Sequence, residues 1–458
     1  MTDSSFASLG LSKEQLANLD SLGYEEMTAV QEKVLPLALD GKDVIAQAKT
    51  GSGKTATFAL PLLSKINPRD FGAQALILCP TRELATQVAA EVRRLARHQK
   101  NIKVVILCGG QSIGPQIGSL EHGAHIVVGT PGRIKDHLRK KTLRLSRVNT
   151  LVLDEADRML DMGFMDDIET IIKQTPRDRQ TVLFSATYPD NIESLSERFQ
   201  QSPVKVSVES LHDEGQIRQL FYLTQRSRKL DSLVKLLGHY QPERAIVFCH
   251  TKDATREVSA HLQKMGIATL ALNGDLEQRD RDQVLIQFRQ QSCRILVATD
   301  VAARGLDIHE LPVVINYDLP KDPESYVHRI GRTGRAGKEG LALSLLTDRE
   351  QHKLDGIGAF QGSHLTAEPI ETLNGSATMT PPDFVTLCIA AGRKEKIRPG
   401  DILGALTGEA GIPGSAVGKI DILEYAAYVA IHHNVVAKAL EGLQRGRIKG
   451  RSFKIRKL

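Results

Sequence analysis

The stretch DVIAQAKTGSGKTATF, residues 43–58, has the order strand, small-residue turn, helix. Its first residues are β-branched or aliphatic, and its last residues begin an apolar pattern with helical period. Between them, Ala48, Gly53, Lys54 and Thr55 match the phosphate-binding loop pattern, with alanine in the first glycine position. The alternative is a glycine-rich turn that only caps a helix, but the flanking strand and helix favour the loop. The stretch therefore predicts the start of an α/β domain.

The same alternation continues along the chain. Six aliphatic runs, each followed by a charged helical segment, come first, and five more follow: DVIAQ, QALILCP, KVVILCGG, HIVVGTP, TLVLDEAD and QTVLFSAT, then RAIVFCH, ATLALNG, RILVATD, VVINYDL and LALSLL. This order predicts two α/β domains, each a parallel sheet covered on both faces by helices. Nearly every run ends in Gly, Thr, Ser, Asp or Arg, so these polar residues should converge on one rim of each sheet.

The domain boundaries follow from the composition of the connecting segments. We expect the α/β domains at residues 1–207 and 216–368, with a linker at 208–215 inside the junction SPVKVSVESLHDEGQ. Residues 369–382 are rich in Gly, Ser, Thr and Pro and predict a second linker. Residues 383–458 have the order β-α-β-β-α-β, which fits a small α+β RNA-recognition fold.

The charge of the chain is concentrated at its C-terminal end. The 458 residues have a formal net charge of +6, and residues 380–458 contain 13 Lys or Arg against 7 Asp or Glu. The preceding residues are therefore neutral overall, and the last segment has the character of a separate module that binds a polyanion.

The sequence indicates a cytoplasmic protein. It has no basic start followed by an apolar core, and no apolar run approaches the roughly 18 residues that cross a bilayer. Its cysteines lie in or beside apolar runs without CxxC spacing, which predicts reduced core residues and neither disulfides nor zinc. They are Cys79, Cys108, Cys249, Cys293 and Cys388.

The loop after residue 47 predicts a nucleotide and magnesium site. Backbone amides of its small residues can surround phosphates, Lys54 supplies a cation to the outer phosphates, and the Thr55 hydroxyl suits Mg²⁺. The loop residues that we place around the phosphates are Ala48, Thr50, Gly51, Ser52 and Gly53.

The run LVLDEADRML, residues 151–160, ends an apolar strand in three closely spaced carboxylates. A buried charge is costly unless it is paired or holds a metal, so these groups should lie at a polar strand end or meet a cation. A solvated turn is the alternative. With the phosphate loop present, we expect Asp154 to hold Mg²⁺ and Glu155 to orient or deprotonate the attacking water, whereas Asp157 tethers neighbouring segments.

DEAD at residues 154–157 is the signature of the DEAD-box RNA helicases, and the chain resembles this family over about residues 6–365. The other family motifs appear in order: GYEEMTAVQ ending at Gln31, AKTGSGKT, PTREL at 80–84, GG at 109–110, TPGR at 130–133, SAT at 185–187, VFCHTK at 247–252, ATDVAARGLDI at 298–308 and HRIGRTGRAG at 328–337. The resemblance implies two tandem RecA-like domains and an ATP-dependent, RNA-stimulated unwinding activity.

The resemblance also implies roles for residues at the nucleotide. Tyr24 would stack on adenine and Gln31 would bond its edge, which selects ATP. Asp307 would contact the ribose, while Arg332 and Arg335 would reach the γ-phosphate from the second domain as arginine fingers. The SAT residues Ser185 and Thr187 would couple the ATP site to the RNA groove.

RNA contacts would be divided between the two domains. They would recognise phosphates and 2′-hydroxyls without regard to sequence. The implied residues are Arg82, Gly110, Thr130 and Arg133 in the first domain, and Thr251, Gly274, Arg281 and Thr299 in the second. By composition alone, GDLEQRDRDQVLIQF at 274–288 is a helix with a solvated charged face, and only the resemblance assigns Arg281 to RNA.

The C-terminal module has a poor surface for base stacking, since EYAAYVAI keeps only Tyr428 in register and LCIAAG has no aromatic residue. Cations cluster instead in GRKEKIRPGD and QRGRIKGRSFKIRKL. Our candidates for binding structured RNA are Arg393, Lys394, Lys396, Arg398, Arg445, Arg447, Lys449, Arg451 and Lys454. A basic solubilising tail is the alternative, but the segment has the apolar periodicity of a folded domain.

This module resembles that of the DbpA subgroup of bacterial DEAD-box proteins. The resemblance implies recognition of a hairpin in large-subunit ribosomal RNA near the peptidyl-transferase centre, and action on pre-ribosomal particles late in assembly. We expect a monomer.

Two other functions compete with an RNA helicase. A non-hydrolysing, ATP-gated RNA clamp would lack the loop lysine, the base carboxylate or a finger, but Lys54, Glu155 and Arg335 are all present. A DNA translocase of related fold is disfavoured by TPGR and DEAD.

Overall fold

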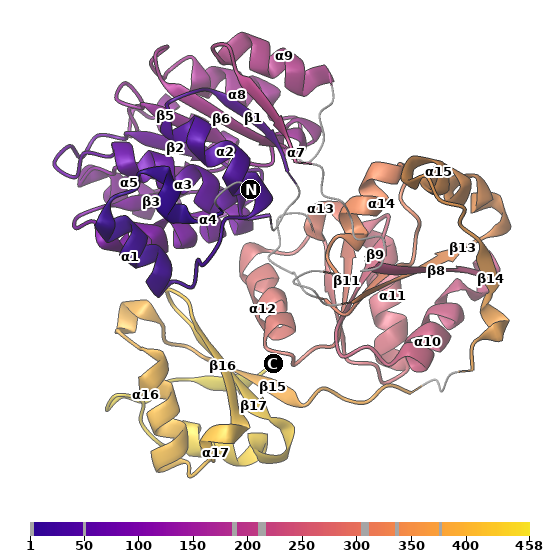
Figure 1. Cartoon of the computed structure of the whole chain (residues 1–458). Helices are drawn as coiled ribbons and strands as arrows, with labels where there is room; N and C mark the ends of the chain where they lie inside the picture. Colours follow the sequence, from indigo (N-terminus) through magenta and orange to yellow (C-terminus); the bar gives the residue numbers. More distant parts are fainter. Residues whose placement is uncertain are drawn as a thin grey trace. The chain divides into compact units, whose positions relative to one another are not determined.

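The computed structural model describes residues 4–48, 52–185, 190–208, 217–303, 311–334, 339–374 and 378–458. These residues form three sheets, which Figure 1 shows coloured along the sequence. The first sheet belongs to one compact unit, and the second and third sheets belong to another. The predicted fold class, two tandem RecA-like domains and a small α+β domain, is confirmed.

The first sheet has the strand order β3-β4-β2-β5-β6-β1-β7, and its pairings are parallel. Its strands are β1 (Val44–Gln47), β2 (Ala75–Leu78), β3 (Val104–Leu107), β4 (Ile126–Gly129), β5 (Thr150–Leu153), β6 (Gln180–Ser185) and β7 (Val204–Ser207). The first six were predicted. Strand β7 lies in the stretch interpreted as a junction and pairs with β1 at the edge of the sheet. Its short VKVS pattern is only partly buried, which weakens the sequence signal.

Helices cover both faces of this sheet because successive strand residues point to opposite sides. In β2, Ala75 and Ile77 pack with residues of α2, α3 and α4, whereas Leu76 and Leu78 pack with residues of α6, α7 and α8. The helices are α1 (Lys13–Ser21), α2 (Ala29–Leu39), α3 (Lys54–Lys65), α4 (Arg82–Leu95), α5 (Gly114–Glu121), α6 (Pro131–Arg139), α7 (Ala156–Asp161), α8 (Met165–Ile172) and α9 (Asp190–Phe199).

The second sheet repeats the parallel arrangement in the order β10-β11-β9-β12-β13-β8-β14. Its strands are β8 (Ile217–Leu223), β9 (Ala245–Cys249), β10 (Thr269–Leu272), β11 (Ile295–Thr299), β12 (Val313–Asn316), β13 (Gly340–Leu346) and β14 (Ala367–Pro369). Its helices are α10 (Lys229–Tyr240), α11 (Lys252–Lys264), α12 (Gln278–Arg289), α13 (Asp300–Ala303), α14 (Pro323–Ile330) and α15 (Gln351–Gln361). Strands β8 and β14 were not predicted. Within the segment predicted as the second linker, Ile370 and Leu373 are buried in the core of this domain.

The third sheet is antiparallel, with the order β16-β17-β15-β18. Along the chain its elements are β15 (Phe384–Ile389), α16 (Pro399–Gly404), β16 (Val417–Ile422), β17 (Ala427–His432), α17 (Val436–Arg445) and β18 (Ile455–Lys457). The predicted β-α-β-β-α-β order is therefore confirmed. One face of the sheet forms the module's core with the two helices.

The predicted burial of the cysteines is confirmed for all five. Among the described residues, no helix combines the length and the apolar composition that crossing a membrane requires.

Candidate nucleotide and RNA sites

The phosphate loop is shaped by the glycine that precedes α3. Gly53 has φ +90°, and a Cβ at this position would lie 2.6 Å from Nε2 of Gln31. The backbone conformation favours glycine, since residues with a Cβ rarely adopt this φ, and a Cβ would also crowd the Gln31 amide. Lys54 then begins α3, with Thr55 beside it. The predicted loop residues Thr50 and Gly51 lie outside the described residues.

Lys54 and Asp154 meet at the base of the loop although a hundred positions separate them. The Lys54 Nζ and Asp154 Oδ1 atoms are 3.8 Å apart, and only 6% and 3% of the two side chains is exposed. Burial raises the pKa of the Asp154 carboxyl to about 6, against the opposing effect of Lys54. Within the described part of the chain, neither atom has a hydrogen-bond partner.

Such a pair fits a phosphate and a metal ion. Buried polar atoms in folded proteins nearly always have partners, so a cationic nitrogen and a carboxylate oxygen without them mark a place for a charged ligand. Magnesium is usually bound through one or two carboxylates together with the phosphates of the substrate. The donor set of Asp154, the neighbouring Thr55 hydroxyl and Lys54 therefore suits Mg²⁺ with a nucleotide.

Glu155 is held in a strained position next to this pair. Its φ and ψ are 53° and 54°, in the left-handed region, immediately before α7 begins at Ala156. A residue without glycine's freedom adopts this conformation at some cost, which is common at functional sites. Its Oε2 accepts a hydrogen bond of 2.5 Å from Nη1 of the buried Arg158. No role was predicted for Arg158, which fixes the direction of this carboxylate.

The predicted adenine residues contact the phosphate loop and the helices around it. Gln31 is buried, accepts a 2.8 Å bond from the Thr28 amide and donates a 3.2 Å bond to the Gly53 carbonyl. The Thr28 hydroxyl donates to the Ser52 carbonyl at 2.7 Å. These contacts tie the start of α2 to the phosphate loop.

Tyr24 is held in place by contacts with two other residues. Its hydroxyl donates a 2.7 Å bond to Glu91, and its ring lies edge-on to Phe6 with centroids 6.0 Å apart. Burial, with help from Glu91, raises the pKa of the Tyr24 hydroxyl. Phe6 and Glu91 were missed in the sequence analysis. The contacts of Tyr24 and Gln31 with adenine stay predictions.

The predicted RNA residues of the first domain lie at the carboxyl ends of β2, β3 and β4, which are neighbours in the sheet. Arg82 opens α4, Gly110 has φ +74° after β3, and Thr130 and Arg133 lie at the start of α6. In the described chain, the Nη1 atoms of both arginines are buried without a hydrogen-bond partner. Buried guanidinium nitrogens without a hydrogen-bond partner are well suited to donate to a phosphate oxygen.

The predicted RNA residues of the second domain also meet at one sheet rim. Thr251, Gly274 and Thr299 follow or end the adjacent strands β9, β10 and β11. Arg281 of α12 donates a 2.7 Å bond to the Ala302 carbonyl, and the Thr299 hydroxyl accepts from the Ala302 amide at 3.3 Å. The structure thus brings Arg281 and Thr299 to the same short helix, α13.

Of the residues predicted to reach the nucleotide from the second domain, only Arg332 is described. Its amide donates to the Arg329 carbonyl at 3.2 Å, just after α14. Asp307 and Arg335 lie outside the described residues, as does Thr187 of the predicted coupling segment. The roles of these four residues stay predictions.

Arg329 was missed in the sequence analysis although it lies within the HRIGRTGRAG motif. It is 2% exposed and forms two bonds of 2.6 Å to the Asp300 carboxylate. Its Nη1 atom also donates to the Asn316 side chain and the Asp318 carbonyl, and its guanidinium lies over the Phe248 ring. Arg329 therefore locks α14 to the strand ends that present Thr299.

We expect Arg329→Ala to lower the free energy of unfolding by about 3 kcal/mol, because removing one partner of a buried ion pair leaves the other uncompensated. Thermal unfolding monitored by circular dichroism measures this change. Arg349→Ala, at an exposed arginine of the same domain, is the control and should leave the melting temperature unchanged. An equally stable Arg329→Ala protein would contradict the locking role.

The two basic clusters of the C-terminal module lie together. The Lys449 ammonium donates to the Lys396 carbonyl at 2.9 Å, which joins the loop before α16 to the loop before β18. We call the candidate cations on these two loops the basic rim: Arg393, Lys394, Lys396, Arg398, Arg445, Arg447, Lys449, Arg451 and Lys454. The structure therefore forms one surface from residues that are about fifty positions apart.

An exposed aromatic residue adjoins the basic rim. Tyr425, in the turn between β16 and β17, is 63% exposed. The amides of Arg393 and Lys394 donate to the carbonyls of Leu423 and Glu424 in the same turn. An exposed ring beside cations is a surface on which an unpaired base can stack. Tyr425 lies outside the strand register of Tyr428 and was therefore not among the predicted RNA-binding residues.

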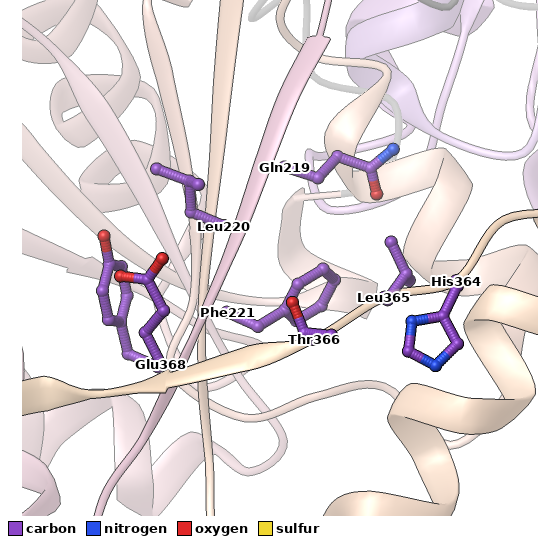
Figure 2. A pocket seen from close by; sticks show the side chains of 8 residues that line it. Gln219, Leu220, Phe221, His364, Leu365, Thr366 and Glu368 are labelled. Atoms are coloured by element: carbon purple, nitrogen blue, oxygen red, sulfur yellow. The ribbon is translucent and has the colours of Figure 1, made fainter.

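A cavity of about 160 Å³ lies elsewhere, along β8 and the segment leading into β14 (Figure 2). Its lining is Gln219, Leu220, Phe221, Tyr222, His364, Leu365, Thr366 and Glu368. It contains none of the predicted site residues, so we assign the nucleotide to the phosphate loop and not to this cavity.

Comparison with known proteins agrees with this arrangement. Residues 28–195 match the DEAD/DEAH box helicase family, residues 228–337 the helicase conserved C-terminal domain, and residues 386–457 the DbpA RNA binding domain. The chain is 50% identical over 444 residues to the ATP-dependent RNA helicase DbpA of Escherichia coli, covering 97% of both chains. It is also 50% identical to the ATP-dependent RNA helicase CshA of Listeria monocytogenes over 75% of this chain and 66% of that protein.

Solved structures show the same likeness. Saccharomyces cerevisiae Dbp5 bound to RNA and ADP BeF3 matches 81% of this chain and 96% of its own, with a TM-score of 0.74 and 32% identity.

Proposed function

Because the chain belongs to the DEAD-box ATP-dependent RNA helicases and carries a DbpA RNA-binding domain, we propose that this domain directs its unwinding activity to large-subunit ribosomal RNA. The enzyme is an RNA-dependent ATPase. The proposed target is a hairpin near the peptidyl-transferase centre, met in pre-ribosomal particles in the cytoplasm by a monomer. The observation that carries the proposal is the basic rim on the folded C-terminal module. The residues that precede this module have no net formal charge.

The proposed chemistry assigns one task to each residue at the nucleotide. Lys54 would bind the outer phosphates, and Thr55 and Asp154 would hold Mg²⁺, which would supply charge stabilisation for the transferred phosphoryl group. Glu155, directed by Arg158, orients the attacking water and accepts its proton. Tyr24 and Gln31 select adenine, and Arg332 with Arg335 stabilises the charge that develops on the γ-phosphate.

The proposed RNA path explains why two domains are needed. Arg82, Gly110, Thr130 and Arg133 hold the backbone in one domain, and Thr251, Gly274, Arg281 and Thr299 hold it in the other. The halves close around one strand when ATP is bound, which bends that strand and expels its partner, and hydrolysis reopens the cleft. Since these contacts do not read bases, preference for a particular RNA must come from the tethered module.

ATPase rates with ribosomal RNA and with unrelated RNA of equal length test the targeting. We expect ribosomal RNA to give half-maximal stimulation at a concentration about a hundredfold lower than unrelated RNA requires. Linked binding modules commonly raise affinity by that order. Tyr425→Ala should weaken this preference by removing a stacking surface, whereas Phe360→Ala, at another exposed ring, should not. Equal stimulation by both RNAs would refute the targeting and leave the helicase assignment untouched.

A further inference from the structure

We propose that the amino edge of the first sheet carries a second RNA-binding surface, which holds RNA that flanks the strand bound at the carboxyl edge. The loops that lead into β2 and β5 form this surface. The proposal rests on the RNA path proposed above, which occupies the opposite edge of the same sheet. We call the surface the amino-edge patch, and its members are Arg69, Phe71, Lys140, Lys141, Arg144 and Arg147.

The two loops lie side by side because the strands that they precede, β2 and β5, are paired in parallel. The Arg147 Nη1 atom is 2.5 Å from the Asp70 Oδ1 atom. The Asn149 amide donates to the Gln74 carbonyl at 2.9 Å. The patch is therefore one surface of the first domain, made of residues that are far apart in the sequence.

The loop before β5 concentrates positive charge. Residues 138–148 contain five Lys or Arg and no Asp or Glu, and all five cationic side chains are exposed. Two of them are paired, Arg139 with Asp136 at 3.0 Å and Arg147 with Asp70. Cations held close together repel one another, so this arrangement favours an anionic partner. Within the described part of the chain, no ion pair is formed by the other three, which are Lys140, Lys141 and Arg144.

Buried leucines hold this loop in place. Leu143, Leu145 and Val148 are at most 6% exposed and belong to the core between the sheet and helices α6, α7 and α8. Arg144 lies between the two leucines in the chain and is exposed. A polyanion that binds here therefore meets cations on an ordered backbone, so less conformational entropy is lost on binding.

Lys141 has a backbone conformation that favours glycine. Its φ is 56°, in the left-handed region, directly after the end of α6. Its amide donates to the Leu138 carbonyl at 2.9 Å, and the Thr142 amide donates to the His137 carbonyl at 3.0 Å. Glycine is the usual residue at this place after a helix, because it has no Cβ. A lysine in this conformation, at some cost in stability, points to a function for its side chain.

The dipole of α6 does not explain the whole cluster. Cations near the C-terminal end of a helix offset its dipole, but the effect fades within the last turn. Helix α6 ends at Arg139, and Arg144 and Arg147 lie five and eight residues beyond it. These two arginines therefore need another explanation.

An exposed aromatic ring borders the cations. Phe71 is 47% exposed, and its ring centroid is 4.7 Å from that of His125. A Cβ added to Gly72 would lie 2.7 Å from Cδ of Arg147, so the loop that carries Phe71 passes directly beside this arginine. RNA is commonly held by cations at its phosphates and by aromatic rings at its unpaired bases. The combination favours RNA over an acidic protein.

Helix α6 connects the patch to the RNA contacts proposed at the carboxyl edge. Thr130 and Arg133 lie at the start of the helix, and Lys140 follows its end. Its nine residues span about 14 Å. RNA that leaves the carboxyl edge can reach the patch along this helix, so a substrate with flanking duplex should gain affinity.

Binding of two RNAs of non-ribosomal sequence to the full-length protein tests the patch. One is a short single strand, and the other is the same strand extended at both ends by about ten base pairs of duplex, one helical turn. The native protein should bind the extended RNA about tenfold more tightly. Replacing Lys140, Lys141 and Arg144 together by Gln should remove this gain. It should also lower the slope of log affinity against log salt by about 2, since each phosphate contact contributes about 0.7 to 0.9.

A matched triple variant controls for net charge. Lys13→Gln, Lys205→Gln and Arg349→Gln remove the same charge from exposed positions outside the patch, and this protein should keep the gain. Circular dichroism shows whether each variant is folded. Equal losses in both triple variants would overturn the proposal, as would an undiminished gain in the patch variant or no gain in the native protein.

Lys141→Gly separates RNA binding from stability. Glycine relieves the left-handed backbone, so the melting temperature should rise, whereas affinity for the extended RNA should fall about two- to fivefold. Phe71→Ala should lower the same affinity about fivefold by removing a stacking surface. A more stable Lys141→Gly protein with native affinity would make this lysine purely structural and contradict the proposal.

A different variant tests the RNA path at the carboxyl edge. Arg133→Ala should weaken binding of the short single strand, which the carboxyl edge holds. Unchanged binding of that strand would refute the path, whereas the patch is tested by the difference between the two RNAs.

Discussion

Glu155→Gln and Lys54→Ala should each lower RNA-stimulated ATP turnover by about a thousandfold, the range expected for removing a general base or a phosphate-binding cation. Glutamine keeps the shape of Glu155 and can still contact Arg158, but it cannot accept a proton from water. Alanine at position 54 removes the cation next to Asp154. Phosphate release measured at saturating RNA gives the effect on kcat.

Asp161→Asn, an exposed carboxylate at the end of the same short helix as the DEAD motif, is the matched control and should turn over ATP normally. Circular dichroism should show that both active-site variants are folded. If either folded variant retained RNA-stimulated phosphate release, the role assigned to its residue would be wrong.

Removing residues 380–458 should abolish the preference for ribosomal RNA and leave a weaker ATPase response that is alike for all RNAs. The loss should be about hundredfold in the RNA concentration that gives half-maximal stimulation, since the core then binds without the tethered module. Competition between labelled ribosomal hairpin and unrelated RNA measures the same ratio directly.

The truncation also uncovers Ile286 and Gln290 of the second domain, which contact residues of the module, so a full-length variant is needed beside it. Arg393→Ala with Arg447→Ala weakens the basic rim and leaves these contacts in place. This double variant should also lose its preference for ribosomal RNA. The salt dependence of its RNA binding should be weaker, because fewer phosphate contacts release fewer counterions. Full preference in both proteins would refute the role of the module.

Much of the fold could be predicted because the signals are local. The strand runs, the single elements of the last segment and the phosphate loop each occupy fewer than about twenty consecutive residues, where side-chain period and glycine placement reflect backbone geometry. Strands β7 and β14, which lie at sheet edges, and β8, which lies next to an edge, were not predicted, because partly exposed strands have weaker apolar patterns.

The candidate site was predicted in its residue types but not in its contacts. Lys54 and Asp154 were both named, yet their buried pairing depends on the strand order of the sheet, in which only β6 separates β5 from β1. Arg158 and Arg329 were missed because an arginine in a motif looks the same whether it binds a ligand or holds another side chain. Their hydrogen bonds separate these cases.

The sequence by itself determined that the chain forms two α/β domains, the first with a phosphate-binding loop, and a basic α+β module, because turn residues and apolar periods act over short distances. Only the tertiary structure decided that Gln290, directly after α12, bonds to Asp421, Tyr428 and Thr386 on three strands of the module, and that the basic rim is one surface. Such contacts join residues that are far apart in the chain, and their free energy depends on complementary burial that no local pattern records.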